Sequence, residues 1–253
     1  MDIPDWASAV AAAAAGLAIG PWLGALIARV PRGQSLLRRA APCARCGGRL
    51  RAADMVPVAG WLRRRGRCRD CREHFGSWYL AAELITPVAF AALALRLGLR
   101  PALPAFCYLA AIGVALAIID IQHRRLPNAL TLTSYPVALV LLGLAALGTR
   151  GGGHHLADAL IGMAAAGLLY LLQALIYPAG MGWGDVKLSG LIGLYLGWFG
   201  AEVLLAGLLA GYLLGAVTGI ALLVTRRATG KSQIPFGPFM LAGALIVILA
   251  SGL

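Results

Sequence analysis

Residues 102–120 read ALPAFCYLAAIGVALAIID, an apolar run whose only charged residue, Asp120, is its last. A helix of about 20 apolar residues crosses the ~30 Å hydrocarbon core of a bilayer. The run shows no alternation of apolar and polar residues, which argues against a membrane β-barrel. This stretch therefore predicts a transmembrane helix.

Comparable runs recur along the whole chain. Hydrophobic residues make up 60% and charged residues 13% of its 253 residues, whereas soluble domains carry about 25% charged residues. We predict an all-α polytopic membrane protein in three parts: a first span within 1–29, a basic cytoplasmic loop over 30–76 and a seven-span catalytic membrane domain over 77–253. The eight expected transmembrane helices lie near 8–29, 77–96, 102–120, 128–148, 156–178, 185–200, 203–224 and 235–251.

The positive charge is unevenly distributed along the chain. The net charge is +12, and thirteen of the 22 lysine and arginine residues lie between Arg29 and Arg72. Basic loops stay in the cytoplasm, and alternating the spans from there puts nineteen basic residues inside and three outside. Topology and attraction to anionic membrane lipids account for this excess. Nucleic-acid binding is therefore not expected.

The basic loop contains two Cys-x-x-Cys pairs, Cys43 with Cys46 and Cys68 with Cys71. Paired thiolates at this spacing suit tetrahedral Zn²⁺, because each pair supplies two ligands from one tight turn. Disulfides are the alternative, but a cytoplasmic location disfavours them. We therefore predict a structural zinc site in a zinc-ribbon-like loop.

Two aspartates are expected at the cytoplasmic edge of the membrane. Asp120 ends one span, and Asp185, in GMGWGDVKLSG (180–190), begins another. Ionisable groups at membrane depth are costly and are functional candidates by default. Two neighbouring carboxyl groups share a proton, so one activates a water molecule while the other polarises a peptide carbonyl, as in aspartic proteases. We predict that Asp120 and Asp185 are catalytic.

The surroundings of the two aspartates suggest further roles. Gly182 and Gly184 are expected to let the backbone turn sharply and to leave room for a substrate strand. Asp185 begins a helix and Asp120 ends one, so helix polarity suggests Asp185 as the base and Asp120 as the proton-holding partner. The alternative is that each aspartate is only an interfacial residue, paired with Arg124 or Lys187.

The ordered set of motifs resembles the type IV prepilin peptidases, bacterial members of the Gly-x-Gly-Asp membrane aspartic proteases. The first span departs from the family, with Pro21 and Gly24 in GPWLG where Gly-Ser-Phe-x-Asn is usual, and Asp54 replaces a customary asparagine. The matching motifs are RVPRGQS (29–35), the two cysteine pairs, Glu83 in SWYLAAELITP, IIDIQHRRLPN, GMGWGDVKL and QIPFGPF (233–239).

The resemblance implies an enzyme of the bacterial inner membrane that cleaves the leaders of type IV prepilins and type II secretion pseudopilins at the cytoplasmic face. The apolar segment of the pilin would lie among the helices. The resemblance also implies N-methylation of the new N-terminus with S-adenosylmethionine, to which the sequence assigns no binding residues. A peptidase alone, with a structural zinc ribbon, is one alternative. A proton-coupled transporter or scaffold is disfavoured, since the chain shows neither inverted repeats nor midplane carboxylates.

Overall fold

The computed structural model describes residues 5–33, 56–68, 70–72, 74, 76–178, 180–227 and 234–251. Within these residues the fold is all-helical, as predicted, apart from one isolated antiparallel bridge between Arg67 and His74. The elements are α1 (Asp5–Arg29), η1 (Val30–Arg32), α2 (Ala59–Arg64), α3 (Trp78–Leu97), α4 (Leu103–His123), α5 (Asn128–Gly148), α6 (Gly152–Ile176), α7 (Trp183–Gly197), α8 (Ala201–Val224) and α9 (Gly237–Ala250).

Six of the described helices are long and apolar enough to cross a membrane: α1, α3, α4, α5, α6 and α8. A multi-pass membrane protein is therefore confirmed. The other two expected spans correspond to α7, with 15 residues, and α9, with 14 residues. At 1.5 Å per residue each rises only about 21–23 Å, less than the ~30 Å hydrocarbon core.

The distribution of apolar side chains distinguishes outer from inner helices. The helices α5, α6 and α8 expose large apolar side chains, among them Leu147, Ile161 and Val217. Extended apolar surface of this kind is suited to lipid rather than to water. In contrast, every residue of α7 from Leu188 to its end is buried. The interior helix α7 is therefore surrounded by protein along most of its length.

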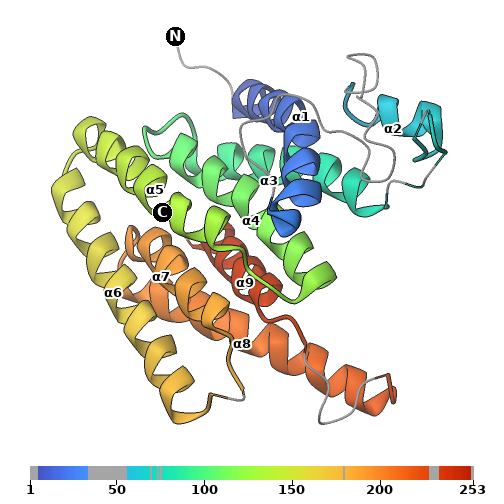
Figure 1. Ribbon diagram of the computed structural model, residues 1–253. Coiled ribbons are helices and arrows are strands. Elements are labelled where there is room, and N and C mark those ends of the chain that lie inside the picture. The colour runs from blue at the N-terminus through green and yellow to red at the C-terminus, as the bar shows by residue number, and fades with distance from the viewer. Residues whose placement is uncertain are drawn as a thin grey trace.

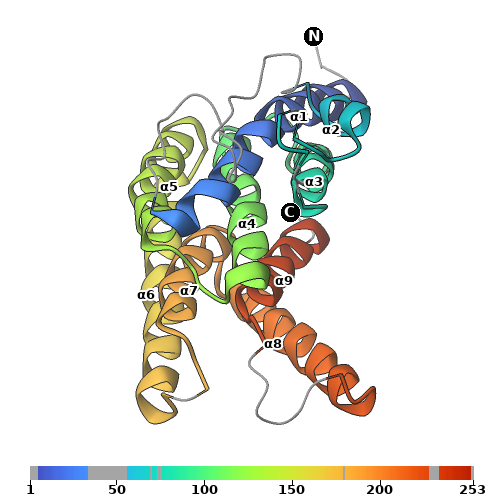
Figure 2. The ribbon, with the colours of Figure 1, turned by 45° about the vertical axis from the view of Figure 1, so that its right-hand side comes forward.

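The bundle is organised around α4 (Figure 1). This helix packs against α1, α3, α5 and α9, and α7 packs against α5, α6, α8 and α9. Figure 2 shows α4 between the α1/α3 pair and the C-terminal helices, with the lower ends of α6 and α8 diverging. The arrangement brings the end of α4 and the starts of α7 and α9 into one region of the molecule.

Small residues on α1 allow it to pack closely on α3. Glycine occurs at every fourth position, as Gly16, Gly20 and Gly24, and therefore lies along one face of the helix. A Cβ atom on Gly16 or Gly20 would lie 2.8 or 3.1 Å from backbone atoms of α3, and one on Gly24 would overlap the ring of Tyr79. Small residues at this spacing are typical of closely packed membrane helices.

Candidate active site

Asp120 lies in the last turn of α4, which continues one turn beyond the expected end of this span. The side chain is buried, with 5% of its surface exposed. Its Oδ2 accepts a hydrogen bond of 3.1 Å from the backbone N–H of Gly237. Gly237 is the first residue of α9, where backbone N–H groups have no partner within the helix. The carboxyl group of Asp120 therefore joins α4 to the start of α9, 117 residues away.

Asp185 lies in the first turn of α7 and is partly buried. Its carboxyl group is turned back toward the residue that precedes the helix, because a Cβ atom on Gly182 would lie 3.1 Å from Oδ2. The carboxyl groups of Asp185 and Asp120 are close enough to interact electrostatically. The fold therefore brings together the two predicted aspartates, which are 65 residues apart in the sequence.

Gly182 and Gly184 lie at the start of α7, and both line the cavity next to the aspartates. Neither has a positive φ, so the turn does not depend on a conformation that favours glycine. A Cβ atom on Gly184 would lie 2.9 Å from the Cβ of Leu126, and one on Gly237 would lie 3.5 Å from the methyl groups of Leu126. Leu126 thus fills the corner between the starts of α7 and α9, and Gly184 allows this close packing.

A cavity of about 770 Å³ lies next to the aspartates. Gly184 and Ile119, the neighbours of Asp185 and Asp120 in the sequence, both line it. Further walls come from η1, the end of α4 and the connection from α4 to α5. This volume falls in the range of about 300–1,000 Å³ that is usual for ligand sites. A cavity of this size, next to the aspartates, has space for a segment of peptide.

The contacts of Lys187 bear on the alternative that Asp185 is only an interfacial residue. Lys187 donates a hydrogen bond of 2.9 Å from Nζ to Oδ1 of Asn128, in the first turn of α5. Its ammonium group is thus engaged by α5 instead of neutralising Asp185. This arrangement favours the pairing of Asp185 with Asp120 over the pairing with Lys187.

Helix polarity does not separate the roles of the two aspartates. Asp185 lies at the start of its own helix, where the partial positive charge favours a carboxylate. Asp120 lies near the end of α4 but receives the N–H of Gly237 at the start of α9. Each carboxyl group therefore faces a helix N-terminus. The expectation that Asp185 is the base and Asp120 holds the proton loses its physical basis.

Tyr170, on α6, lies near the aspartates and was not singled out by the sequence analysis. It is fully buried and close enough to Asp185 to interact with it electrostatically. Its hydroxyl lies beside Tyr212 but has no hydrogen-bond partner of normal geometry among the described residues. Its ring stacks on that of Tyr212 at 5.5 Å, and Tyr212 packs against Phe236, just before α9. In the sequence Tyr170 belongs to an ordinary apolar span, so only the fold reveals its position.

The predicted zinc ligands are only partly described. Cys43 and Cys46 lie outside the described residues. Cys68 is buried and Cys71 is partly buried, and the backbone N–H of Arg72 donates to the carbonyl of Cys68 at 3.1 Å. This hydrogen bond brings the backbone of Arg72 back to Cys68, as in a tight turn. A turn of this kind is how a Cys-x-x-Cys pair supplies two zinc ligands, so this half of the site fits the metal.

Glu83, on α3, has a partner that the sequence analysis did not identify. The side chain is 2% exposed, and its Oε2 accepts a hydrogen bond of 2.7 Å from the backbone N–H of Val58. Val58 immediately precedes α2 and has a φ of 59°, a conformation that costs energy for a β-branched residue. Glu83 therefore fixes the start of α2, within the basic 30–76 loop, to α3.

Comparisons with known proteins agree with this arrangement. The model of the bacterial peptidase A24 N-terminal domain matches residues 14–97, and that of the type IV leader peptidase family matches residues 107–250. The second match includes both aspartates and all of the helices from α5 to α9. No solved structure matches the chain.

Several curated proteins are similar over most of the chain, and each is named prepilin leader peptidase/N-methyltransferase. The protein from Bacillus subtilis (strain 168) is 29% identical over 92% of this chain and 91% of its own length. The protein from Aeromonas hydrophila is 34% identical over 82% of this chain and 70% of its own length. The protein from Burkholderia pseudomallei (strain 1026b) is 37% identical over 79% of this chain and 64% of its own length. The chain therefore belongs to the type IV leader peptidase family.

Proposed function

We propose that this chain is a prepilin leader peptidase that also methylates the N-terminus it exposes. Its substrates are type IV prepilins and type II secretion pseudopilins. The observation that carries the peptidase activity is the pairing of Asp120 with Asp185 beside a cavity large enough for a peptide. The names of the relatives support the substrate class and the second activity.

The chemistry follows from two carboxyl groups that share a proton. The ionised carboxylate takes a proton from a water molecule, whose oxygen attacks the carbonyl carbon of the scissile peptide bond. The protonated carboxyl group donates its proton to the carbonyl oxygen. The carbon–nitrogen bond then breaks: the hydroxyl formed from the carbonyl oxygen returns its proton to the carboxylate that donated it, and the proton taken from water passes to the leaving amine. The pair titrates as a unit, so we assign neither role to one aspartate.

We further propose that α7 and α9 cross the membrane with the six candidate spans, giving eight in all. Gly237 contacts Asp120, so α9 begins at the level where α4 ends. The candidate span α8 precedes α9, and α7 ends shortly before α8 begins. Because α8 ends at the level of Asp120, it begins at the opposite face of the membrane. The interior helix α7 therefore has to cross from the level of Asp185 to that opposite face. Its protein surroundings allow a helix shorter than the hydrocarbon core.

The aspartate-bearing face is cytoplasmic in this proposal, because alternating the spans puts nineteen of the 22 lysine and arginine residues on that side and basic loops stay in the cytoplasm. The membrane is the bacterial inner membrane, and its anionic lipids contact the basic loop. Zn²⁺ would be held by Cys43, Cys46, Cys68 and Cys71 and would stabilise that loop. S-adenosylmethionine would supply the methyl group for the second activity.

The peptidase proposal is tested by replacing each aspartate in turn. We expect Asp120→Asn and Asp185→Asn to abolish removal of the leader from a prepilin in membrane vesicles. Asp158→Asn is the matched control, because Asp158 is exposed near the start of α6, the end of that helix that is far from Asp185. Normal cleavage by either variant of the pair would refute the proposal.

The second activity is tested on the mature product of the wild-type enzyme. After incubation with S-adenosylmethionine, we expect the mass of the product to rise by one methyl group at its N-terminus. Asp185→Asn should give no methylated product from uncleaved prepilin but should methylate a pre-cleaved pilin. A wild-type product without the added methyl group would leave a peptidase alone, with its zinc ribbon as a structural element.

A further inference from the structure

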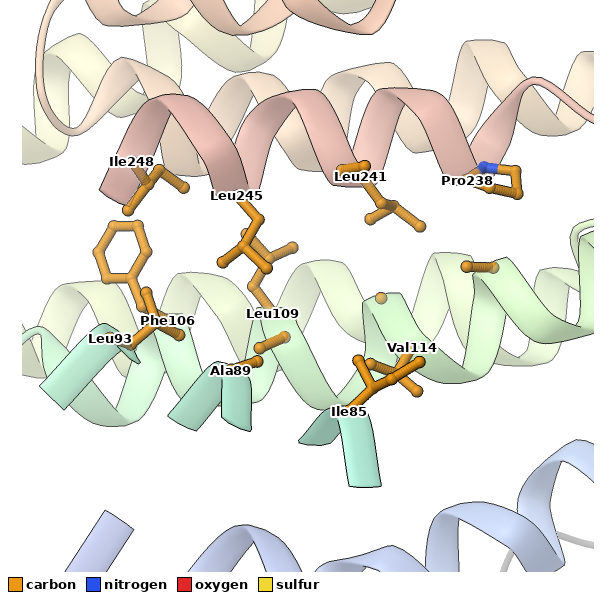
Figure 3. Close-up of a pocket in the computed structure, with 14 residues that line it drawn as sticks. Ile85, Ala89, Leu93, Phe106, Leu109, Val114, Pro238, Leu241, Leu245 and Ile248 are labelled. Atoms are coloured by element: carbon orange, nitrogen blue, oxygen red, sulfur yellow. The ribbon is translucent and has the colours of Figure 1, made fainter. Parts of the chain in front are cut away.

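An apolar groove lies between α3, α4 and α9, separate from the cavity beside the Gly-x-Gly-Asp turn. All 14 residues that line it are apolar, and its volume is about 180 Å³. Figure 3 shows side chains of α9, such as Leu241 and Leu245, pointing across a space toward side chains of α3 and α4. Both α3 and α9 pack on α4 but hardly contact each other, which leaves this space between them.

The groove leads directly to the aspartate site. On α4 its lining residues include Phe106, Ala110, Gly113 and Ala117, spaced three or four residues apart along one face of the helix. The next position on that face, three residues after Ala117, is Asp120. On α9 the lining begins at Pro238, the residue after Gly237, whose N–H donates to Asp120. The groove therefore begins within one helical turn of the carboxyl group.

The dimensions of the groove limit what can enter it. From Pro238 to Ile248 it follows α9 for ten residues, or about 15 Å at the usual helical rise. Its volume of about 180 Å³ slightly exceeds that of a ~150 Å³ cavity known to hold benzene. One or two large apolar side chains therefore fit, whereas a whole helix does not. An occupant would lie along the opening and insert the side chains of one face.

We propose that this groove binds the apolar segment of the substrate on one side of the scissile bond. A peptide at membrane depth satisfies its backbone hydrogen bonds by forming a helix, and such a helix presents a stripe of side chains to the groove. The cavity at the other side of Asp120 includes the basic residues Arg124, Arg125 and Lys187 in its lining, whereas the lining of the groove is wholly apolar, so of the two sites the groove suits an apolar chain better. This inference rests on the proposed peptidase function and specifies how the substrate is held.

The groove contributes by positioning. Lipid chains are as apolar as the lining, so binding inside a membrane depends on close packing instead of removal from water. Packing of the segment along about 15 Å of α9 would fix the peptide bond that emerges at Asp120. A misplacement of about 1 Å can lower the rate about 100-fold, so filling the groove should affect cleavage even though the aspartates are untouched.

The test fills the groove two turns away from Asp120. Gly113→Leu adds a side chain toward Leu241, whose flexible end would lie 3.2 Å from the new Cβ atom. Ala242→Phe adds a ring from α9, at an exposed position that lines the groove. Ala206→Phe, at an exposed position of α8 outside the groove, is the matched control. Each variant is given a prepilin with its full apolar segment and a peptide truncated just after the scissile bond.

We expect the two groove variants to lower kcat/KM for the full prepilin at least ten-fold and to cleave the truncated peptide at the wild-type rate. The control should cleave both substrates at the wild-type rate. Equal loss for both substrates, or loss for neither, would overturn the proposal. If wild-type protein cleaves no prepilin, the proposed function fails instead.

Cross-linking provides a measurement that does not depend on turnover. A photoreactive residue in place of Leu245, in the Asp185→Asn background that retains uncleaved substrate, should form adducts with the apolar segment of the prepilin. The same residue in place of Ala206 should not. Adducts with lipid or with a second copy of the chain, but none with the prepilin, would show a different occupant and refute the inference.

Discussion

The Gly237→Ala substitution tests the contact between α9 and Asp120 by adding a single methyl group. The new Cβ atom would lie 2.9 Å from Oδ2 of Asp120 and 3.5 Å from both methyl groups of Leu126. Non-bonded heavy atoms are most stable at about 3.5–4.0 Å, so the carboxyl group or the start of α9 has to move by roughly 0.5 Å or more. The hydrogen bond of 3.1 Å from Gly237 to Asp120 is then weakened or lost.

The size of the effect follows from that hydrogen bond. A hydrogen bond to a charged group contributes about 1.5–3 kcal/mol, and each 1.36 kcal/mol changes a rate about ten-fold. We therefore expect kcat/KM for prepilin cleavage to fall about 10- to 150-fold. Two backbone effects on stability oppose each other. Alanine is favoured over glycine in a helix by about 1 kcal/mol, whereas Pro238 disfavours the helical conformation of a preceding residue that has a Cβ atom. The net effect of the backbone is therefore small. The Tm should stay within about 4 °C of wild type.

The assay compares purified Gly237→Ala with wild type and with Gly143→Ala in the same lipid environment. Gly143 is also helical, and a Cβ atom there would have no neighbour within 4 Å, so this control should cleave normally. Cleavage is followed by the mass of the product and stability by thermal unfolding. A wild-type rate for Gly237→Ala would refute the reasoning. So would a fall in rate that is matched by a large loss of Tm, since that would reflect unfolding.

Three further substitutions test other parts of the structure. Gly184→Ala should reduce cleavage at least ten-fold because its Cβ atom would lie 2.9 Å from that of Leu126, and adding Leu126→Ala should restore part of the rate; no recovery would contradict the steric explanation. Tyr170→Phe should leave Tm unchanged or slightly higher, since it removes a buried hydroxyl without a normal hydrogen-bond partner among the described residues, yet slow cleavage several-fold; an unaltered rate would exclude a role for the hydroxyl. Cys68→Ser combined with Cys71→Ser should remove zinc from the purified protein, measured by elemental analysis, and unchanged metal content would rule out the proposed site.

The sequence by itself determined the helices and the general location of the site. Apolar runs long enough to span a bilayer define helices through local composition, and α3, α4 and α5 fall within a few residues of their predicted ranges. The uneven distribution of lysine and arginine predicts an orientation in which Asp120 and Asp185 lie at the same face. Each of these inferences depends only on residues close together in the chain or on a simple alternation of spans.

Only the tertiary structure decided which residues surround the aspartates. The contact of Gly237 with Asp120 joins residues 117 positions apart, and the position of Tyr170 near Asp185 depends on how α6 packs on α7. The burial of the short helix α7 and the groove between α3, α4 and α9 also arise from packing between distant helices. Local patterns carry no information on these contacts, because they are set by which faces of the helices fit together.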